Sequence, residues 1–144
     1  MGIFDFLKKR DSPIPRIRRT IQLFEEVSTV EIDPTILQNV ERDKAGIVML
    51  LYMFGALDIL CQSQNIDTKR TLMLFQSLLQ DELGNYSDED AKTLIQAIAQ
   101  ASATPYGKEI MKEGAESIRL WINGLALPHH RLSETLREMA GRNS

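Results

Sequence analysis

The chain has only one cysteine among its 144 residues, Cys61, so its fold must be held without a disulfide. This length allows a single domain to bury roughly 70% of the surface that its unfolded chain exposes. Cys61 follows an apolar run, where a buried thiol that packs as a small hydrophobe is the usual case. No cationic residue lies beside it in the sequence to lower its pKa, so a reactive thiol is not expected.

No apolar run of the chain reaches the roughly 20 residues that a bilayer-spanning helix needs. The longest is Ala45 to Leu57, in which every residue is apolar, Gly or Tyr, and Asp58 ends it. A helix without a polar face must be surrounded by other segments. The sequence therefore predicts a central buried helix at about 44–63, because a block of this length favours helix over strand.

The sequence also lacks the common catalytic motifs. It has no G-x-S-x-G, no glycine-rich phosphate loop, and no nucleophile beside His129 or His130 in the required pattern. We therefore expect no catalytic residue, no cofactor and no enzyme activity. Asp58 is the one residue whose apolar setting could raise a pKa and mark a site. A hydrogen-bonded carboxylate at the edge of the core explains it as well and is favoured.

Charge is unevenly distributed along the chain. Residues 1–20 carry a net charge of +4, and the remaining residues carry −7. An acidic body argues against a nucleic-acid binder, which normally presents a basic face across the domain.

Residues 1–15 are predicted to form a basic amphipathic arm. It contains Ile3, Phe4, Phe6, Leu7, Lys8, Lys9 and Arg10. This composition suits a short helix on an apolar, anionic surface, or a partner-docking segment. The alternative is an arm that folds back on its own bundle or frays. Its charges follow its apolar residues, unlike those of a signal peptide, so a cytoplasmic location is expected.

Residues 16–140 are predicted to form the helical bundle, followed by a polar tail at 141–144. Pro13 and Pro15 break the helical pattern and predict a hinge before a first helix at about 16–28. Helix start signals follow at Asp33-Pro34, at Asp67, at Ser87 and at Thr104-Pro105. Gly84 is the expected terminator of the helix that Asp67 opens.

Apolar residues recur at helical spacing after these signals and predict the core faces. In chain order they are Ile17, Ile21, Phe24 and Val27; Leu72, Phe75, Leu78, Leu79 and Leu83; Ala91, Leu94, Ile95, Ile98 and Ala99; Ile110, Met111, Ile118, Trp121, Ile122 and Leu125; and, after Pro128, Leu132, Leu136 and Met139. The fold class that we predict is all-α: a single-domain bundle of five to six helices around the 44–63 helix.

Two groups of residues contain oxygen or nitrogen donors that metals use. The first is an acidic loop with Asp81, Glu82, Asp88, Glu89 and Asp90, whose oxygens would suit calcium or magnesium. Its spacing does not follow an EF-hand, and acidic residues at a helix N-terminus are favoured by the helix dipole alone. The second pairs His130 with Glu134 on one helix face, which falls short of a zinc ligand set.

The stretch from Phe54 to Ile98 resembles the TerB-like helical domains of tellurite-resistance proteins. The matching residues are Ala56, Asp58, Ile66 and Asp67, while Gln64-Asn65 replaces the family's Asp-Gly turn. The resemblance covers under a third of the chain. It implies an all-helical fold and, as an alternative function, a ligand- or metal-binding domain that uses the acidic loop.

These observations favour a non-catalytic protein that binds a protein partner through its N-terminal arm or an exposed apolar groove. The sequence also leaves open whether the protein forms a homodimer and whether the arm makes a peripheral membrane contact. Binding to nucleic acid is not expected.

Overall fold

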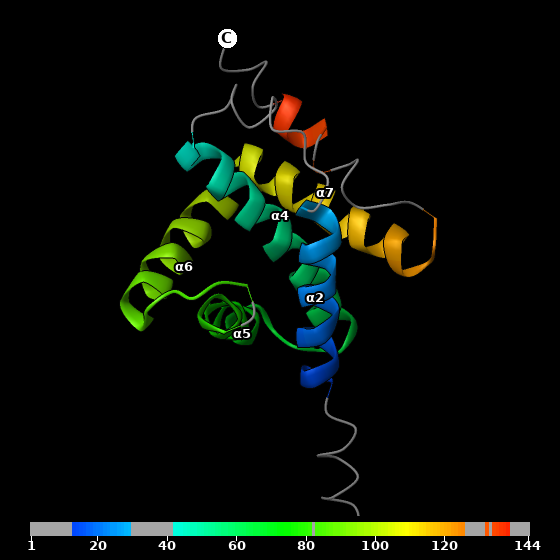
Figure 1. Ribbon diagram of the computed structural model, residues 1–144, viewed down its shortest axis with the longest axis horizontal. Helices are drawn as coiled ribbons and strands as arrows, with labels where there is room; N and C mark the ends of the chain where they lie inside the picture. The colour runs from blue at the N-terminus through cyan, green and yellow to red at the C-terminus, as the bar shows by residue number, and fades with distance from the viewer. Residues whose placement is uncertain (1–12, 30–41, 82, 126–131, 133, 139–144) are drawn as a thin grey trace, which may run out of the picture.

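The computed structural model describes residues 13–29, 42–81, 83–125, 132 and 134–138, and in these it contains helices and no strand (Figure 1). The helices are α2 (Ile14–Thr29), α4 (Arg42–Ser63), α5 (Thr68–Gln80), α6 (Asp88–Ser102) and α7 (Pro105–Ile122). Residues 132 and 134–138 are also helical. The predicted all-α bundle is confirmed. The predicted helix after Asp33 and the polar tail lie outside the described residues.

Helix α4 is the centre of the bundle, as predicted. It contacts α2, α5, α6 and α7 (Figure 1). From Leu51 to Leu57 every residue of α4 is buried. By length and composition alone, the segment Gly46–Ser63 could cross a membrane. The core helix of a helical bundle meets the same two criteria. Here four other helices pack on it.

The most extensive helix–helix contact joins α4 and α7, and glycine makes it possible. A Cβ on Gly55 would lie 2.0 Å from the carbonyl oxygen of Met111, and a Cβ on Gly114 would lie 1.9 Å from that of Tyr52. Because residue 55 meets 111 while 52 meets 114, the two helices run antiparallel. Backbone atoms at these distances leave no room for any side chain, so both positions require glycine.

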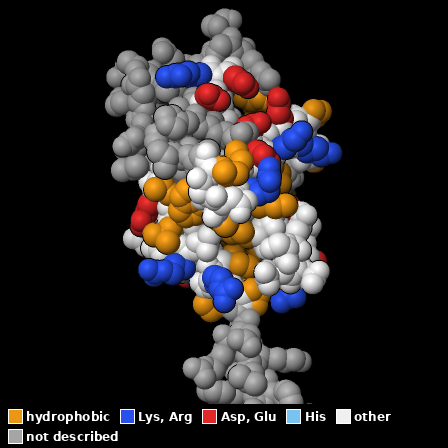
Figure 2. Space-filling model, turned by 90° about the vertical axis from the view of Figure 1, so that its right-hand side faces the viewer, with side chains coloured by type: hydrophobic (Ala, Val, Ile, Leu, Met, Phe, Trp, Pro, Cys, Tyr) orange, Lys and Arg blue, Asp and Glu red, His pale blue; other side chains and the backbone are white. Residues whose placement is uncertain are grey.

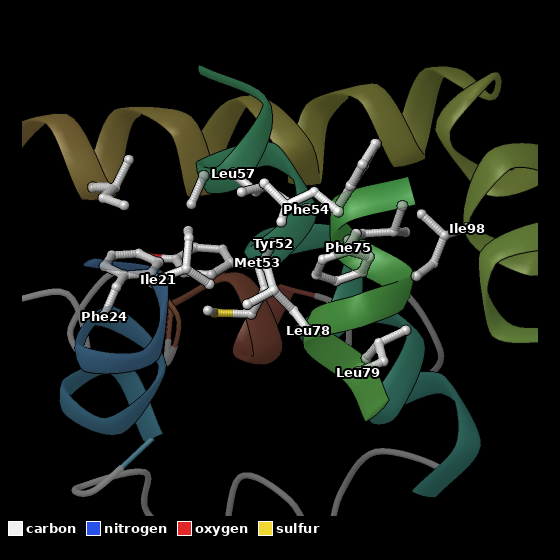
Figure 3. Packing of buried hydrophobic residues seen from close by; sticks show 14 of the residues in the cluster. Ile21, Phe24, Tyr52, Met53, Phe54, Leu57, Phe75, Leu78, Leu79 and Ile98 are labelled. Atoms are coloured by element: carbon white, nitrogen blue, oxygen red, sulfur yellow. The ribbon is translucent and has the colours of Figure 1, made fainter. Parts of the chain in front are cut away.

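Aromatic rings tie the outer helices to this pair (Figure 3). Phe24 of α2 stacks on Tyr52 with ring centroids 5.9 Å apart, and its ring is 5.7 Å from that of Trp121 in α7. Phe54 lies 5.3 Å from Phe75 of α5. Such ring pairs add stability beyond the area that they bury. They fix α2 across both α4 and α7, and α5 against α4.

The predicted N-terminal caps are confirmed at three helices. The side chain of Asp67 accepts a hydrogen bond from the Arg70 amide at 2.8 Å, and Ser87 accepts one from the Asp90 amide at 3.1 Å. Thr104 accepts one from Gly107 at 3.0 Å, directly before Pro105 at the helix start. Each cap satisfies an amide that the first helical turn would otherwise leave without a partner.

The predicted helix break at Pro15 and the predicted helix end at Gly84 are wrong. Helix α2 begins at Ile14, so Pro15 lies in its first turn, where the missing amide of proline removes no helical hydrogen bond. Helix α5 ends at Gln80 and not at Gly84, which does not adopt a positive φ. Instead the Leu83 amide donates to the carbonyl oxygen of Leu78 at 2.7 Å and closes the helix end.

Most of the predicted core residues are buried. They include Ile17, Ile21, Phe24, Phe75, Leu78, Leu79, Ala91, Ile98, Ile110, Ile118, Leu132 and Leu136. Val27, Leu72, Leu83, Leu94, Ile95, Met111 and Trp121 are partly buried. Met139 lies outside the described residues.

Three predicted core positions are wrong: Ala99, Ile122 and Leu125 are exposed. Ile122 is 54% and Leu125 71% exposed, because α7 continues past the contact between Trp121 and Phe24. The helix ends at Ile122, and Gly124 follows it with a φ of 70°, which allows the Leu125 amide to donate to the Leu120 carbonyl at 2.8 Å.

Alanine at Gly55 or Gly114 is expected to lower the free energy of unfolding by at least about 2 kcal/mol, because backbone atoms of the opposite helix must move. Gly46, on the same helix as Gly55, is the control, because a Cβ there meets nothing within 4 Å. Gly46→Ala should raise stability by about 0.5–1 kcal/mol through helix propensity. Urea denaturation of the three variants measures both effects. Equal behaviour of Gly46→Ala and Gly55→Ala would contradict the glycine contact.

Candidate functional site

Two of the acidic residues where α5 ends and α6 begins, Asp81 and Asp88, have cationic partners. Asp81 lies 3.2 Å from the guanidinium of Arg18, and Asp88 lies 3.0 Å from the ammonium of Lys92. The hydrogen bond and the charge of Lys92 lower the pKa of Asp88. Glu89 and Asp90 follow in the first turn of α6, where the helix dipole favours negative charge.

No group of three or more metal-ligating side chains comes together in the part of the chain that the structure describes. Glu82 and His130 lie outside that part. Glu134 is exposed on the short helical segment near the C-terminus. The described members of both metal candidates are therefore not brought together into a ligand set. The arm residues from Ile3 to Arg10 also lie outside the described part.

Asp58 is half-buried at the edge of the core. Its carboxylate accepts a hydrogen bond from Gln62 at 2.7 Å, as the favoured interpretation predicted, and burial raises its pKa. It borders an open groove of about 180 Å³ between α4 and α7, with Lys108 and Lys112 on the opposite wall. Cys61, three residues after Asp58 in α4, is buried as predicted. Burial raises the pKa of its thiol.

A more enclosed hollow of about 200 Å³ lies on a side of α4 that α7 does not line. We call it the α2–α4 hollow. Its lining residues are Glu25 and Thr29 of α2, Gly46, Met49, Leu50 and Met53 of α4, Leu83 and Tyr86 of the following loop, and Leu132. Five of these side chains are aliphatic or thioether groups. A concave, mainly apolar surface with a few polar groups is the usual form of a binding site.

Glu25 supplies the ionisable group of the hollow. Partial burial, followed by repulsion from Glu26, raises the pKa of its carboxyl. The Thr29 hydroxyl donates to the Glu25 backbone carbonyl at 2.8 Å, as is common for threonine within helices. Tyr86, which is 41% exposed, contributes an aromatic ring at the edge. A raised carboxyl pKa at a concave surface is one recognised mark of a functional site.

Sequence reasoning missed this hollow. It placed Met49, Leu50 and Met53 in a uniformly buried run, and it assigned no role to Glu25 or Tyr86. No local signal could have found the hollow, because its residues come from separate segments of the chain and each segment by itself has an ordinary helix or loop composition.

Comparison with protein-family models, with curated proteins and with solved structures finds no match. The resemblance to TerB-like domains stays a prediction. The residues that carry it lie on α4 and in the turn before α5, where Asn65 has a φ of 60° and Asp67 caps the next helix.

The raised pKa of Glu25 predicts the sign of its effect on stability. A carboxyl whose pKa is higher in the folded state holds its proton more tightly there, so its contribution is full at low pH and is lost as the pH rises through the folded-state pKa. Glu25→Gln should therefore unfold at higher urea than the wild type at about pH 7, by less than about 1 kcal/mol given its exposure. Near pH 4, around the usual pKa of glutamate, the difference should shrink. An unchanged difference between the two pH values would contradict this assignment.

Proposed function

We propose that this chain is a non-catalytic interaction module that binds a protein partner by accepting an apolar side chain of that partner in the α2–α4 hollow. The observation that carries the proposal is the hollow itself. At about 200 Å³ it is smaller than the roughly 300–1,000 Å³ of typical small-molecule pockets. One or two side chains inserted from another protein suit it better than a cofactor or a metabolite.

The chemistry of the lining also favours a protein partner. Met49 and Met53 have flexible, polarisable side chains, which are frequent on surfaces that adapt to different partners. Interfaces draw most of their affinity from a few anchor side chains that fill pockets. The carboxyl of Glu25 would add preference for a segment in which a Lys or Arg flanks the apolar anchor. An amphipathic helix laid against α2 and α4 would present its residues in this way.

The alternative, a TerB-like domain that binds a cation in the acidic loop, has less support. Asp81 and Asp88 already have cationic partners in Arg18 and Lys92. A homodimer stays a prediction, as does a cytoplasmic location.

Selection of a displayed random peptide library on the full-length protein, followed by fluorescence anisotropy with the enriched peptides, tests the proposal. Gly46 lines the hollow and faces open space, so it offers a matched pair of variants. Gly46→Leu should fill the hollow and weaken peptide binding at least tenfold, because the anchor side chain loses its pocket. Gly46→Ala changes the same backbone position and should bind like the wild type.

Enriched peptides should contain an apolar anchor next to a basic residue. Binding that is equal for the Leu and Ala variants would place the docking surface elsewhere. Failure to enrich any peptide would count against a peptide-binding hollow altogether.

A further inference from the structure

The groove between α4 and α7 has charges of opposite sign on its two walls. Asp58 lies on the α4 wall, and Lys108 and Lys112 lie on the α7 wall. Apolar exposure alone would not single out a site. On the face of the molecule shown in Figure 2, hydrophobic side chains are exposed beside Lys, Arg, Asp and Glu side chains, and such mixed exposure is ordinary on folded proteins.

Each helix contributes one face to this groove. Asp58 and Gln62 are four residues apart on α4, and Lys108 and Lys112 are four residues apart on α7. Residues with this spacing share a helix face. The close helix contact at Gly55 closes the groove between the two faces. Two hydrogen-bond acceptors on one wall are therefore opposite two ammonium groups on the other.

The polar groups of the two walls retain bonding capacity. Asp58 accepts one hydrogen bond, from the Gln62 side-chain amide at 2.7 Å. Its other carboxylate oxygen and the Gln62 carbonyl oxygen can accept further hydrogen bonds. Among the described residues, no ion pair joins Asp58 to either lysine, and neither lysine pairs with another carboxylate.

The acidic residues of α7 do not line this groove. Glu109 and Glu113 line a different hollow, together with Tyr106. Glu116 forms an ion pair with Arg119 on its own helix. The positive charge on the α7 wall of the groove is therefore open to a ligand.

Unpaired charges of opposite sign on facing walls favour a ligand that carries both charges. A simple anion such as phosphate would be attracted by the lysines and repelled by Asp58, and a simple cation would meet the reverse. A molecule with an ammonium group at one end and a carboxylate at the other forms charge-assisted hydrogen bonds with both walls. The groove of about 180 Å³ equals the volume of about six water molecules in the liquid, which limits the ligand to a small molecule.

We propose that the groove between α4 and α7 binds a small amino acid in its zwitterionic form. The ammonium group of the ligand donates to Asp58 and Gln62, and its carboxylate accepts from Lys108 and Lys112. Its carbon chain lies over the helix contact at Gly55. This site goes beyond the proposed protein-binding function, because it shares no lining residue with the α2–α4 hollow.

NMR titration of the full-length protein with L-valine and with its isomer 5-aminopentanoate tests the proposal. At least one isomer should produce saturable shifts at the amides of Asp58, Lys108 and Lys112. Its Kd should be about 1 mM, because so small a molecule makes few contacts. Pentanoate and pentylamine each carry only one of the two charges, and each should bind at least about fivefold more weakly.

Two variants separate the walls of the groove. Asp58→Asn keeps the shape of the side chain and removes its charge, so it should weaken amino-acid binding about fivefold and strengthen pentanoate binding. Lys108→Gln with Lys112→Gln should weaken the binding of both ligands about tenfold. The matched control is Lys69→Gln with Lys92→Gln, which removes the same charge from exposed positions outside the groove and should bind like the wild type.

Three outcomes would overturn the proposal. The first is the absence of saturable shifts with both isomers. The second is pentanoate binding as tight as that of the amino acid, or equal responses of the two ligands to Asp58→Asn, because the groove would then recognise only an anion. The third is a set of shifts centred on the α2–α4 hollow, which would place the ligand there. None of these outcomes depends on peptide binding, so they are distinguishable from a failure of the proposed function.

Discussion

The close approach of α4 and α7 is the constraint on which the rest of the structure depends. The backbones of the two helices are in contact at Gly55 and at Gly114, and a Cβ atom at either position would clash with the opposite backbone. Because the two axes come so near, Tyr52 and Trp121 both reach Phe24, and α2 can pack across the pair. Close packing of this kind transmits any change in one helix to its neighbours.

The same arrangement decides which surfaces stay open. Helix α7 covers one side of α4, α5 and α6 contact it elsewhere, and α2 crosses near its N-terminal half. Among the described residues none fills the side between α2 and the loop at Leu83 and Tyr86, and this side forms the α2–α4 hollow. The exposed start of α2 is likewise a product of this packing, since Arg18 alone among its arginines turns inward to Ser77.

Local chemistry could be predicted well from the sequence. Asp67, Ser87 and Thr104 cap helices where expected, and the core helix lies within a few residues of its predicted bounds. Caps depend on groups within one helical turn, so neighbours in sequence suffice to identify them. The wrong core predictions concern residues whose surroundings are formed by segments distant in the sequence. Leu125 continues the apolar pattern of α7, yet it is 71% exposed and no other segment of the described chain covers it. The hollow around Glu25 could not be foreseen for the same reason.

By itself the sequence determined that this protein is helical, where most helices begin, and that one apolar segment must be enclosed by the others. These follow from hydrogen bonding along the backbone and from the cost of exposing apolar surface, both of which act through local composition. The tertiary structure alone decided that α4 and α7 touch at Gly55 and Gly114. It also decided that Asp81 forms an ion pair with Arg18 and that Met49 and Met53 border a hollow. Contacts between residues far apart in the chain depend on how helices are placed in space, which no single segment specifies.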